Sequence, residues 1–330
     1  MKKYLISVGL STIISVIVGF LIIPLLKKLK FGQSILSYVS EHDYKSGTPT
    51  VGGIIFATSC LIMYYICRTS ENRLSSVCVA VFLAYMAVGF IDDFIKIKLK
   101  RNEGLNPIQK TLFEIVIALV VSVFAYTRGL TKINIPFTKI TVDIGWWYIP
   151  LCAFVFIAAT NSVNLTDGLD GLAAGVTYVY MLSFAVLLAL QIKTENISYP
   201  VGEEYANIAE FSVCLSGALI GFLLFNTYKA KVFMGDTGSL ALGGAVAVTG
   251  ALSGNILYIP VIGITYVASS ISVILQVAYF KRTKGKRLFL MAPLHHHFQH
   301  KGYSESKIAF GYKFVTMIAG IAVIVFNIAR

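Results

Sequence analysis

Charged residues are scarce in this sequence. Asp, Glu, Lys and Arg together make up 13% of its 330 residues, about half of the roughly 25% that soluble globular domains carry. Hydrophobic residues account for 56% of the chain, and the mean hydropathy is +0.75. These values exclude an ordinary soluble fold. Because a helix needs about 20 apolar residues to cross a bilayer, the chain has room for about ten spans and for no separate soluble domain.

Acidic residues are the scarcer of the two charged classes. There are 16 Asp and Glu against 28 Lys and Arg, a net charge of +12 at pH 7. The basic residues stand between apolar stretches, where positive loops orient membrane helices, so we expect no nucleic-acid partner. If the loops after odd-numbered spans are cytoplasmic, that side holds 18 Lys and Arg and the other side 9, with Lys313 inside the last span. This excess predicts that both termini are external.

The five cysteines lack a metal-site or disulfide pattern. They lie in or beside apolar stretches, so we expect them to pack as small hydrophobic residues. We also expect the first residues to form a membrane span rather than a signal peptide. The apolar run after Lys2 and Lys3 has no small-residue cleavage site and ends in a lysine cluster at residues 27–30, as a first membrane span does.

Ten apolar windows are present in the sequence. They cover residues 4–26, 51–67, 75–95, 108–127, 147–163, 171–190, 207–225, 239–256, 258–280 and 306–328. Only a short stretch with Asn255 and Pro260 separates the eighth window from the ninth, so a single broken helix is the alternative there. The expected fold is an all-α integral membrane protein of about ten transmembrane helices, with residues 1–330 forming a single polytopic domain.

One loop predicts a different structure. Residues 133–144, between the fourth and fifth windows, alternate apolar and polar side chains, which is typical of a small β-hairpin. The sequence Trp-Trp-Tyr at 146–148 follows, where an interfacial aromatic belt is expected. By the charge count, this hairpin is external.

The third window ends in two acids and a lysine. Lys96 lies four residues after Asp92 and three after Asp93, so a carboxylate and an ammonium can share one face of a helix. Ionisable residues at the edge of the hydrocarbon are costly and mark functional sites. An ordinary ion pair at a solvated helix end is the alternative.

Two further stretches combine glycine with polar side chains. Residues 161–172 read Asn-Ser-Val-Asn-Leu-Thr-Asp-Gly-Leu-Asp-Gly-Leu. The glycines would let a ligand approach the backbone, and the carboxylates and amides would recognise it. An N-cap for the next helix is the alternative, but it would explain only one of these residues. In the stretch 233–239, Asp236 stands between two glycines, and a carboxylate there can bind Mg²⁺. Phe233 offers a ring on which a base can stack. A plain turn and ordinary packing are the alternatives.

Histidines and a lysine complete the set of polar residues. The basic run 281–287 is followed by His295, His296 and His297. Three consecutive histidines cannot all face one metal ion, so we expect them to contact phosphate or sugar instead. Lys45 precedes a Thr-Pro-Thr-Val-Gly-Gly turn. Polar groups from five separate loops therefore converge on one membrane face, as Mg²⁺ and two phosphate-bearing substrates require.

These segments resemble the polyprenyl-phosphate N-acetylhexosamine 1-phosphate transferase superfamily, and most closely its phospho-N-acetylmuramoyl-pentapeptide transferase branch. The likeness spans the whole chain. Five motifs occur in family order: Thr48-Pro-Thr-x-Gly-Gly, Asp92-Asp93-x-x-Lys96, Asn161-x-x-Asn164-Leu-Thr-Asp-Gly-Leu-Asp-Gly, Phe233-Met-Gly-Asp-Thr-Gly-Ser and Ala292-Pro-Leu-His-His-His-Phe. The resemblance implies Mg²⁺-dependent transfer from UDP-N-acetylmuramoyl-pentapeptide to undecaprenyl phosphate, which gives lipid I and UMP. It also implies a cytoplasmic cleft in the bacterial inner membrane, contact with membrane lipid and usually a homodimer.

The resemblance also implies roles for individual residues. Asp236 would ligate Mg²⁺, Asp92 would position the lipid phosphate or act as its base, and Asp93 would support that site beside Lys96. The donor's pyrophosphate or sugar would contact Asn226 and the three histidines. The nucleoside pocket and other substrate contacts would come from Lys45, Thr50, Asn161, Asn164, Asp167, Gly168, Leu169, Asp170 and Phe233. Two positions depart from the family pattern: Lys229 replaces a proline, and Gln299-His300 replaces an acidic and apolar pair.

Two other functions compete with this interpretation. An N-acetylglucosamine 1-phosphate transferase of the same superfamily shares the aspartate motifs, but the triple histidine favours the muramoyl branch. A secondary transporter usually shows internal repeats and ionisable residues near the midplane of the membrane. This sequence shows no repeat, and its acids cluster at span ends. Glu114 and Lys313 are the exceptions, because each lies about two turns inside its span.

Overall fold

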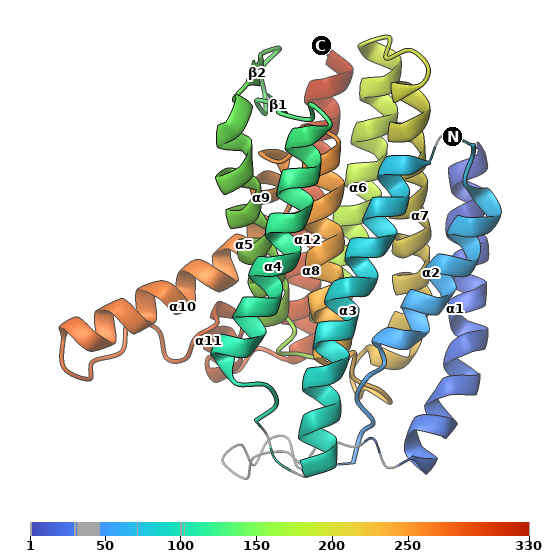
Figure 1. Cartoon of the computed structure of the whole chain (residues 1–330). Coiled ribbons are helices and arrows are strands. Elements are labelled where there is room, and N and C mark those ends of the chain that lie inside the picture. Colours follow the sequence, from blue (N-terminus) through green and yellow to red (C-terminus); the bar gives the residue numbers. More distant parts are fainter. Residues whose placement is uncertain are drawn as a thin grey trace.

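Long apolar helices make up most of the chain (Figure 1). A computed structural model describes residues 2–29, 31, 47–70, 72–99, 101 and 103–329. Its elements are α1 (Lys2–Lys28), α2 (Gly53–Cys67), α3 (Arg73–Leu99), α4 (Pro107–Thr127), β1 (Lys132–Asn134), β2 (Thr141–Asp143), η2 (Gly145–Trp147), α5 (Tyr148–Thr166), α6 (Leu172–Thr194), α7 (Val201–Asn226), α8 (Gly235–Leu252), α9 (Tyr258–Ile262), α10 (Ile264–Arg282), α11 (Leu294–His300) and α12 (Glu305–Ala329).

Among the described residues, eight helices are long and apolar enough to cross a membrane. They are α1, α3, α4, α5 with its leading η2 turn, α6, α7, α10 and α12. The second and eighth windows correspond to α2, which is a shorter apolar helix of 15 residues, and to α8, which has 18 residues. The predicted all-α membrane fold of about ten helices is therefore confirmed.

The helix α8 lies at the centre of the bundle, and small residues let its neighbours approach it. Every residue of α8 from Thr237 to Leu252 is buried. A Cβ added at Gly53 of α2 would lie 2.6 Å from the Cα of Gly238, and one at Gly89 of α3 would lie 2.0 Å from the carbonyl oxygen of Asp236. Glycines at such positions bring membrane helices into backbone contact. The start of α8 is therefore held between α2 and α3.

The ninth window contains a break that hydropathy did not predict. The short α9 ends at Ile262, Gly263 follows, and α10 then leaves the bundle at an angle (Figure 1). A Cβ at Gly263 would lie 2.7 Å from the carbonyl oxygen of Ile259, so the close turn favours glycine. The eighth and ninth windows form separate helices joined by residues 253–257, so the single broken helix is not observed.

The predicted hairpin is present, at the same end of the bundle as both termini (Figure 1). Strands β1 and β2 pair antiparallel with Ile133 opposite Val142. Trp146 and Trp147 are exposed and stack on each other, as an interfacial belt requires. The prediction was wrong for Tyr148, which is fully buried. Its hydroxyl donates to the carbonyl oxygen of Ala251 at 2.6 Å, which satisfies the buried polar group.

Candidate active site

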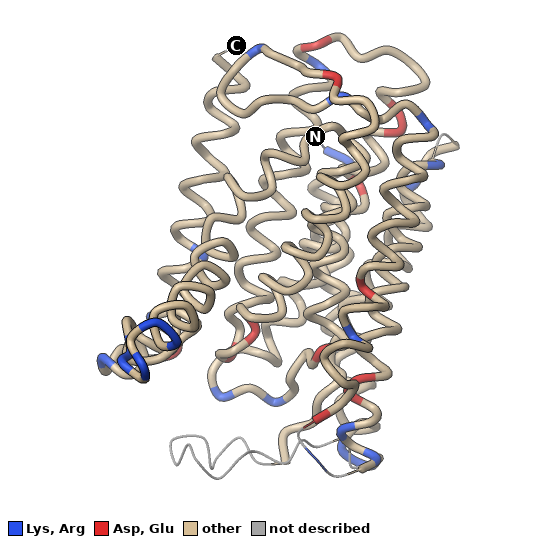
Figure 2. The backbone as a smooth tube through the Cα atoms, turned by 60° about the vertical axis from the view of Figure 1, so that its left-hand side comes forward, with Lys and Arg blue, Asp and Glu red and all other residues tan. Residues whose placement is uncertain are grey.

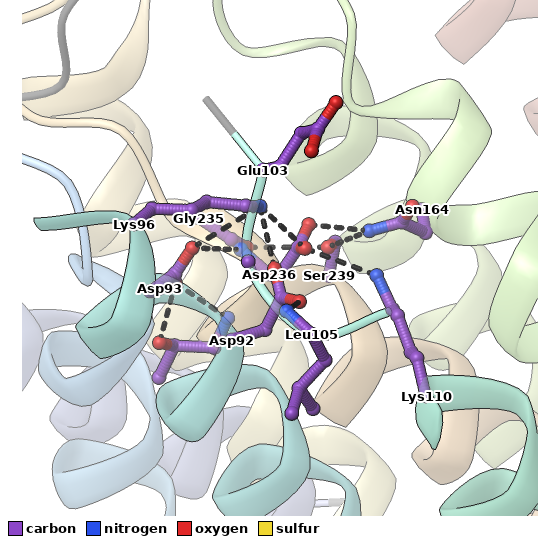
Figure 3. Close-up of polar contacts among 12 residues, drawn as sticks. Asp92, Asp93, Lys96, Glu103, Leu105, Lys110, Asn164, Gly235, Asp236 and Ser239 are labelled. Atoms are coloured by element: carbon purple, nitrogen blue, oxygen red, sulfur yellow. Dashed lines mark hydrogen bonds and ion pairs between the residues drawn. The ribbon is translucent and has the colours of Figure 1, made fainter. Parts of the chain in front are cut away.

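Three carboxylates meet where α3 ends and α8 begins (Figure 3), at the end of the bundle opposite the termini (Figure 1). Asp92 and Asp93 lie near the end of α3, and Asp236 lies in the first turn of α8. One oxygen from each can be chosen so that all three lie within 4.8 Å of one another. The close approach of α3 to α8 at Gly89 makes this meeting possible.

Asp93 fixes the start of α8. Its carboxylate accepts hydrogen bonds from the backbone N–H groups of Asp236 at 3.2 Å and Thr237 at 2.9 Å, and from the Thr237 hydroxyl at 2.6 Å. The first N–H groups of a helix have no partner within the helix, and a carboxylate there also interacts favourably with the helix dipole. Asp93 therefore acts as an N-cap supplied by another helix, and it orients Asp236.

Two lysines converge on Asp236. The Nζ of Lys96 lies 2.8 Å from Oδ2 of Asp236 and 2.6 Å from Oδ2 of Asp92. The Nζ of Lys110 on α4 lies 3.0 Å from the same Asp236 oxygen. The other oxygen, Oδ1, accepts from the side-chain amide of Asn164 at 2.8 Å. Asp236 is thus the hub of the polar network (Figure 3).

The sequence interpretation missed the role of Lys110, which it counted only as a loop lysine. The helix α4 begins with a capping box, in which Asn106 and Gln109 bond each other's backbone and side chain, and Pro107 occupies the first helical position. These features fix where the helix starts and so place Lys110 in line with Asp236. The capping pattern was visible in the sequence, but the partner on α8 was not.

Glu114, for which the sequence offered no explanation, has a partner on α5. It is buried, and its Oε2 accepts from the side-chain amide of Asn161 at 2.7 Å and from the Thr160 hydroxyl at 3.3 Å. Glu114 lies one helical turn beyond Lys110. The predicted substrate residue Asn161 is therefore turned toward α4, while Asn164 reaches Asp236.

The loop between α5 and α6 lies against the histidine helix α11. A Cβ at Gly168 would lie 2.3 Å from Nε2 of His295 and 3.1 Å from Nε2 of His296. His295 is fully buried, and neither of its ring nitrogens has a hydrogen-bond partner among the described residues. Burial lowers the pKa of His295 to about 3, and the neighbouring His296 adds to this effect. His295 is therefore a neutral imidazole.

Asp167 in the same loop is held close to other acids. Burial, and to a lesser extent the charges of Asp236, Asp93 and Asp170, together raise its pKa to about 8. A protonated carboxyl can donate a hydrogen bond. Asp167 can therefore offer a donor as well as an acceptor to a ligand at neutral pH.

Other predicted contact residues hold the backbone of the site. The carboxylate of Asp170 accepts from the N–H of Ala230 at 3.0 Å, and the amide of Asn226 donates to the carbonyl of Val232 at 2.9 Å, so both brace the loop that contains Lys229. Leu169 is buried in the core. These bonds explain the loop's shape without the family proline.

Two of the remaining predicted substrate residues, Thr50 and Phe233, lie near the start of α8. Thr50 is buried, and its Oγ1 would lie 2.6 Å from a Cβ at Gly235. Phe233 is half-buried, and its backbone pairs with the segment before α2, through its N–H to Pro49 and its carbonyl to Gly52. Lys45 lies outside the described residues.

The other two histidines have polar partners. His296 Nδ1 lies 3.0 Å from the Oε1 of Gln299, one of the two positions that depart from the family pattern. His297 Nδ1 accepts from the N–H of Leu290 at 3.1 Å. His297 thus faces the segment before α11, whereas His295 and His296 both face Gly168.

The carboxylate cluster suits a divalent cation. Carboxylate oxygens are the ligands that hard cations prefer, and two ammonium groups leave the three carboxylates with excess negative charge. Both oxygens of Asp93 bind the backbone of α8, whereas the partners of Asp236 are side chains that can move aside, and Asp92 shares one of them. Because each carboxylate oxygen also has a second lone pair, Asp236 and Asp92 are the candidate ligands. The site can therefore bring a cation, two lysines and a phosphate together.

Known proteins resemble this chain along nearly its whole length. Residues 74–254, which include all three aspartates of the cluster, match the family described as glycosyl transferase family 4. The phospho-N-acetylmuramoyl-pentapeptide-transferase of Thermoanaerobacter sp. (strain X514) is 43% identical over 97% of each chain. The proteins of that name from Caldanaerobacter subterraneus subsp. tengcongensis and Clostridioides difficile (strain 630) are 45% and 41% identical, over 96% and 94% of this chain and 96% and 93% of their own.

Proposed function

The chain belongs to glycosyl transferase family 4 and, within it, to the phospho-N-acetylmuramoyl-pentapeptide transferases, and we propose on this premise that it makes lipid I. It transfers phospho-N-acetylmuramoyl-pentapeptide from its UDP-linked donor to undecaprenyl phosphate and releases UMP. The observation that carries this proposal is the meeting of Asp92, Asp93 and Asp236 with Lys96 and Lys110 at one end of a membrane bundle. The transporter alternative is not supported, because the relatives are transferases by name.

The proposed cation is Mg²⁺, held by Asp236 with Asp92 beside it. When bound, Mg²⁺ supplies charge neutralisation at the phosphate oxygens of the donor. Lys96 and Lys110 add positive charge on the same side of Asp236. Phosphoryl transfer depends mainly on such positioning and electrostatic stabilisation.

We further propose direct attack by the acceptor lipid. A phosphate monoester has its second pKa near 6, so undecaprenyl phosphate is mostly dianionic at pH 7 and needs little help from a base. An oxygen of this phosphate forms the new bond to the donor's sugar-bearing phosphorus, and the bond from that phosphorus to the oxygen of UMP breaks. Asp92, which is anchored by the N–H of Leu105 at 2.8 Å and by Lys96, positions the acceptor.

The donor is proposed to lie across the loop after α5 and the histidine helix. Asp167, Gly168 and Phe233 form the nucleoside side, and His296 and His297 reach the pyrophosphate or sugar. The active site then faces the cytoplasm, where nucleotide sugars are found, and both termini face outward. That orientation agrees with the excess of lysine and arginine in the predicted cytoplasmic loops. The homodimer remains a prediction.

An assay of UMP release with two donors tests the proposal. Purified chain in detergent with undecaprenyl phosphate and Mg²⁺ should release UMP from UDP-N-acetylmuramoyl-pentapeptide and little from UDP-N-acetylglucosamine. The same reaction without acceptor lipid should give no burst of UMP matching the enzyme concentration, because direct attack forms no covalent intermediate. Equal rates with both donors would favour the N-acetylglucosamine branch, and a stoichiometric burst would overturn direct attack.

A further inference from the structure

The helix α10 forms a hairpin that stands apart from the bundle. We call residues 264–293 the α10 hairpin: α10 runs outward, and the chain returns along it (Figure 1). Gln276 holds the two arms together, since its Oε1 accepts from the N–H groups of Leu288 at 3.0 Å and Phe289 at 2.8 Å. Large apolar side chains are exposed on α10, among them Ile271, Ile274, Leu275 and Val277.

Five lysine and arginine side chains lie at the tip of this hairpin. They are Lys281, Arg282, Lys284, Lys286 and Arg287, and all five are exposed. The sequence contains no Asp or Glu between residues 237 and 304. Within the part of the chain that the structure describes, no salt bridge joins any of the five to a carboxylate. The tip therefore concentrates positive charge, seen as a cluster of blue segments in Figure 2, and the exposed apolar side chains of α10 lie beside it.

The hairpin is also bonded to the histidine helix. The N–H of Leu290 donates to Nδ1 of His297 at 3.1 Å, and the N–H of Leu294 donates to the hydroxyl of Ser272 at 2.9 Å. The position of the hairpin therefore affects how α11 presents its side chains. Anything that fixes the hairpin also steadies this helix.

We propose that the tip of the α10 hairpin binds the phosphate headgroups of anionic phospholipids at the bilayer surface. Lysine and arginine close to a membrane are attracted to such headgroups, and the attraction fades within a Debye length. The apolar side chains of α10 continue directly from the cations, so they lie among the acyl chains of the same lipids. This continuity favours a lipid surface over an acidic protein, which would leave the apolar face uncovered. Lipid binding at the tip also holds α11 in place.

Lipid selectivity of the reconstituted chain tests this site without any substrate. Spin-labelled phosphatidylglycerol and phosphatidylcholine are compared in phosphatidylcholine vesicles, and the ratio of their association constants with the protein is measured. The unsubstituted chain should prefer phosphatidylglycerol. The variant K281Q/R282Q/K286Q/R287Q should lower the ratio to about one, because most of the local attraction is gone. A charge-preserving variant, K281R/R282K/K286R/R287K, should keep the preference, because the attraction depends on the charge and not on the particular side chain.

A matched control removes four exposed cations elsewhere at the same end of the bundle. The variant K27Q/K28Q/K98Q/R101Q has the same change in net charge and should keep the preference. No preference in the unsubstituted chain, or equal losses in the hairpin and control variants, would overturn the site. A second measurement rests on the proposed function: UMP release should rise with the phosphatidylglycerol fraction in the unsubstituted chain and not in the hairpin variant. Because lipid selectivity is measured without substrate, it tests the lipid site even if the proposed transferase function is wrong.

Discussion

Gly168 shows how one missing side chain shapes the site. Its backbone lies so close to the ring of His295 that a methyl group would overlap Nε2. The imidazole is fully buried and so has little room to move aside. Glycine at this position therefore lets the loop after α5 rest on the histidine helix, which joins two parts of the proposed donor site.

Gly168→Ala should loosen this contact. We expect overpacking of about 1–3 kcal/mol, seen as a lower melting temperature in detergent, together with a higher KM for the UDP-linked donor. Gly9→Ala in α1 is the control, because no heavy atom lies within 4 Å of its added Cβ. An unchanged melting temperature and KM in Gly168→Ala would show that the loop and α11 do not depend on close contact.

Asp167 predicts a pH dependence of stability. Its pKa in the folded chain is about 8, above the value of roughly 3.9 in an unfolded chain. The stability that this difference contributes is fully present below about pH 4 and is lost progressively as the pH rises from about 4 through about 8. In buffer with a chelator, the melting temperature should therefore fall more steeply between about pH 5 and pH 8 for the unsubstituted chain than for Asp167→Asn, which cannot ionise. Parallel curves would contradict the raised pKa.

Single residues were predictable from the sequence only in part. The aspartates, asparagines and histidines were found because polar groups at the ends of apolar windows are conspicuous. Lys110 was not, since an isolated lysine beside a span normally orients the helix, and its bond to Asp236 crosses 126 positions of sequence. The capping role of Asp93 was hidden for the same reason, because its partners are backbone N–H groups of a distant helix.

At the scale of elements, the pair α3 and α8 determines the geometry of the proposed active site. Gly89 allows the backbone of α3 to touch the first turn of α8, and Asp93 completes the contact from the next turn of α3. The start of α8 at Gly235 was not predicted, since the apolar window begins at residue 239 and the cap that extends the helix comes from α3. The bend at Gly263 also escaped prediction, because both of its flanks are apolar.

Gly89→Ala should disrupt this pair more than Gly168→Ala disrupts its loop. The new Cβ would lie 2.0 Å from a backbone oxygen and 2.4 Å from a backbone carbon of Asp236, and backbone atoms cannot move aside as a side chain does. The two helices must separate, which shifts Asp92 and Asp93 away from Asp236. Because a misplacement of about 1 Å can cost about a hundredfold in rate, we expect kcat to fall by about tenfold or more. Full activity in Gly89→Ala would contradict the claim that backbone contact sets the carboxylate geometry.

For the whole molecule, hydropathy and charge predicted most of the arrangement. Ten apolar windows, the hairpin and the gathering of polar groups at one end were all visible as patterns, and the family resemblance is confirmed by relatives over nearly the full length. The outward course of α10 was not visible, because a span that leaves the bundle is as apolar as one that stays. Its exposed side chains are suited to lipid rather than to other helices.

The account as a whole depends on Asp236 as the hub of a cation-dependent transferase. The most direct test is lipid I formation by purified chain across a Mg²⁺ titration, with Asp236→Asn beside the unsubstituted protein and Lys98→Gln as a folded control. Activity should appear only with Mg²⁺ in the unsubstituted and control proteins. It should be absent from Asp236→Asn at every concentration, because a neutral amide cannot replace a charged ligand. Lipid I formation by Asp236→Asn with an unchanged Mg²⁺ dependence would contradict the account.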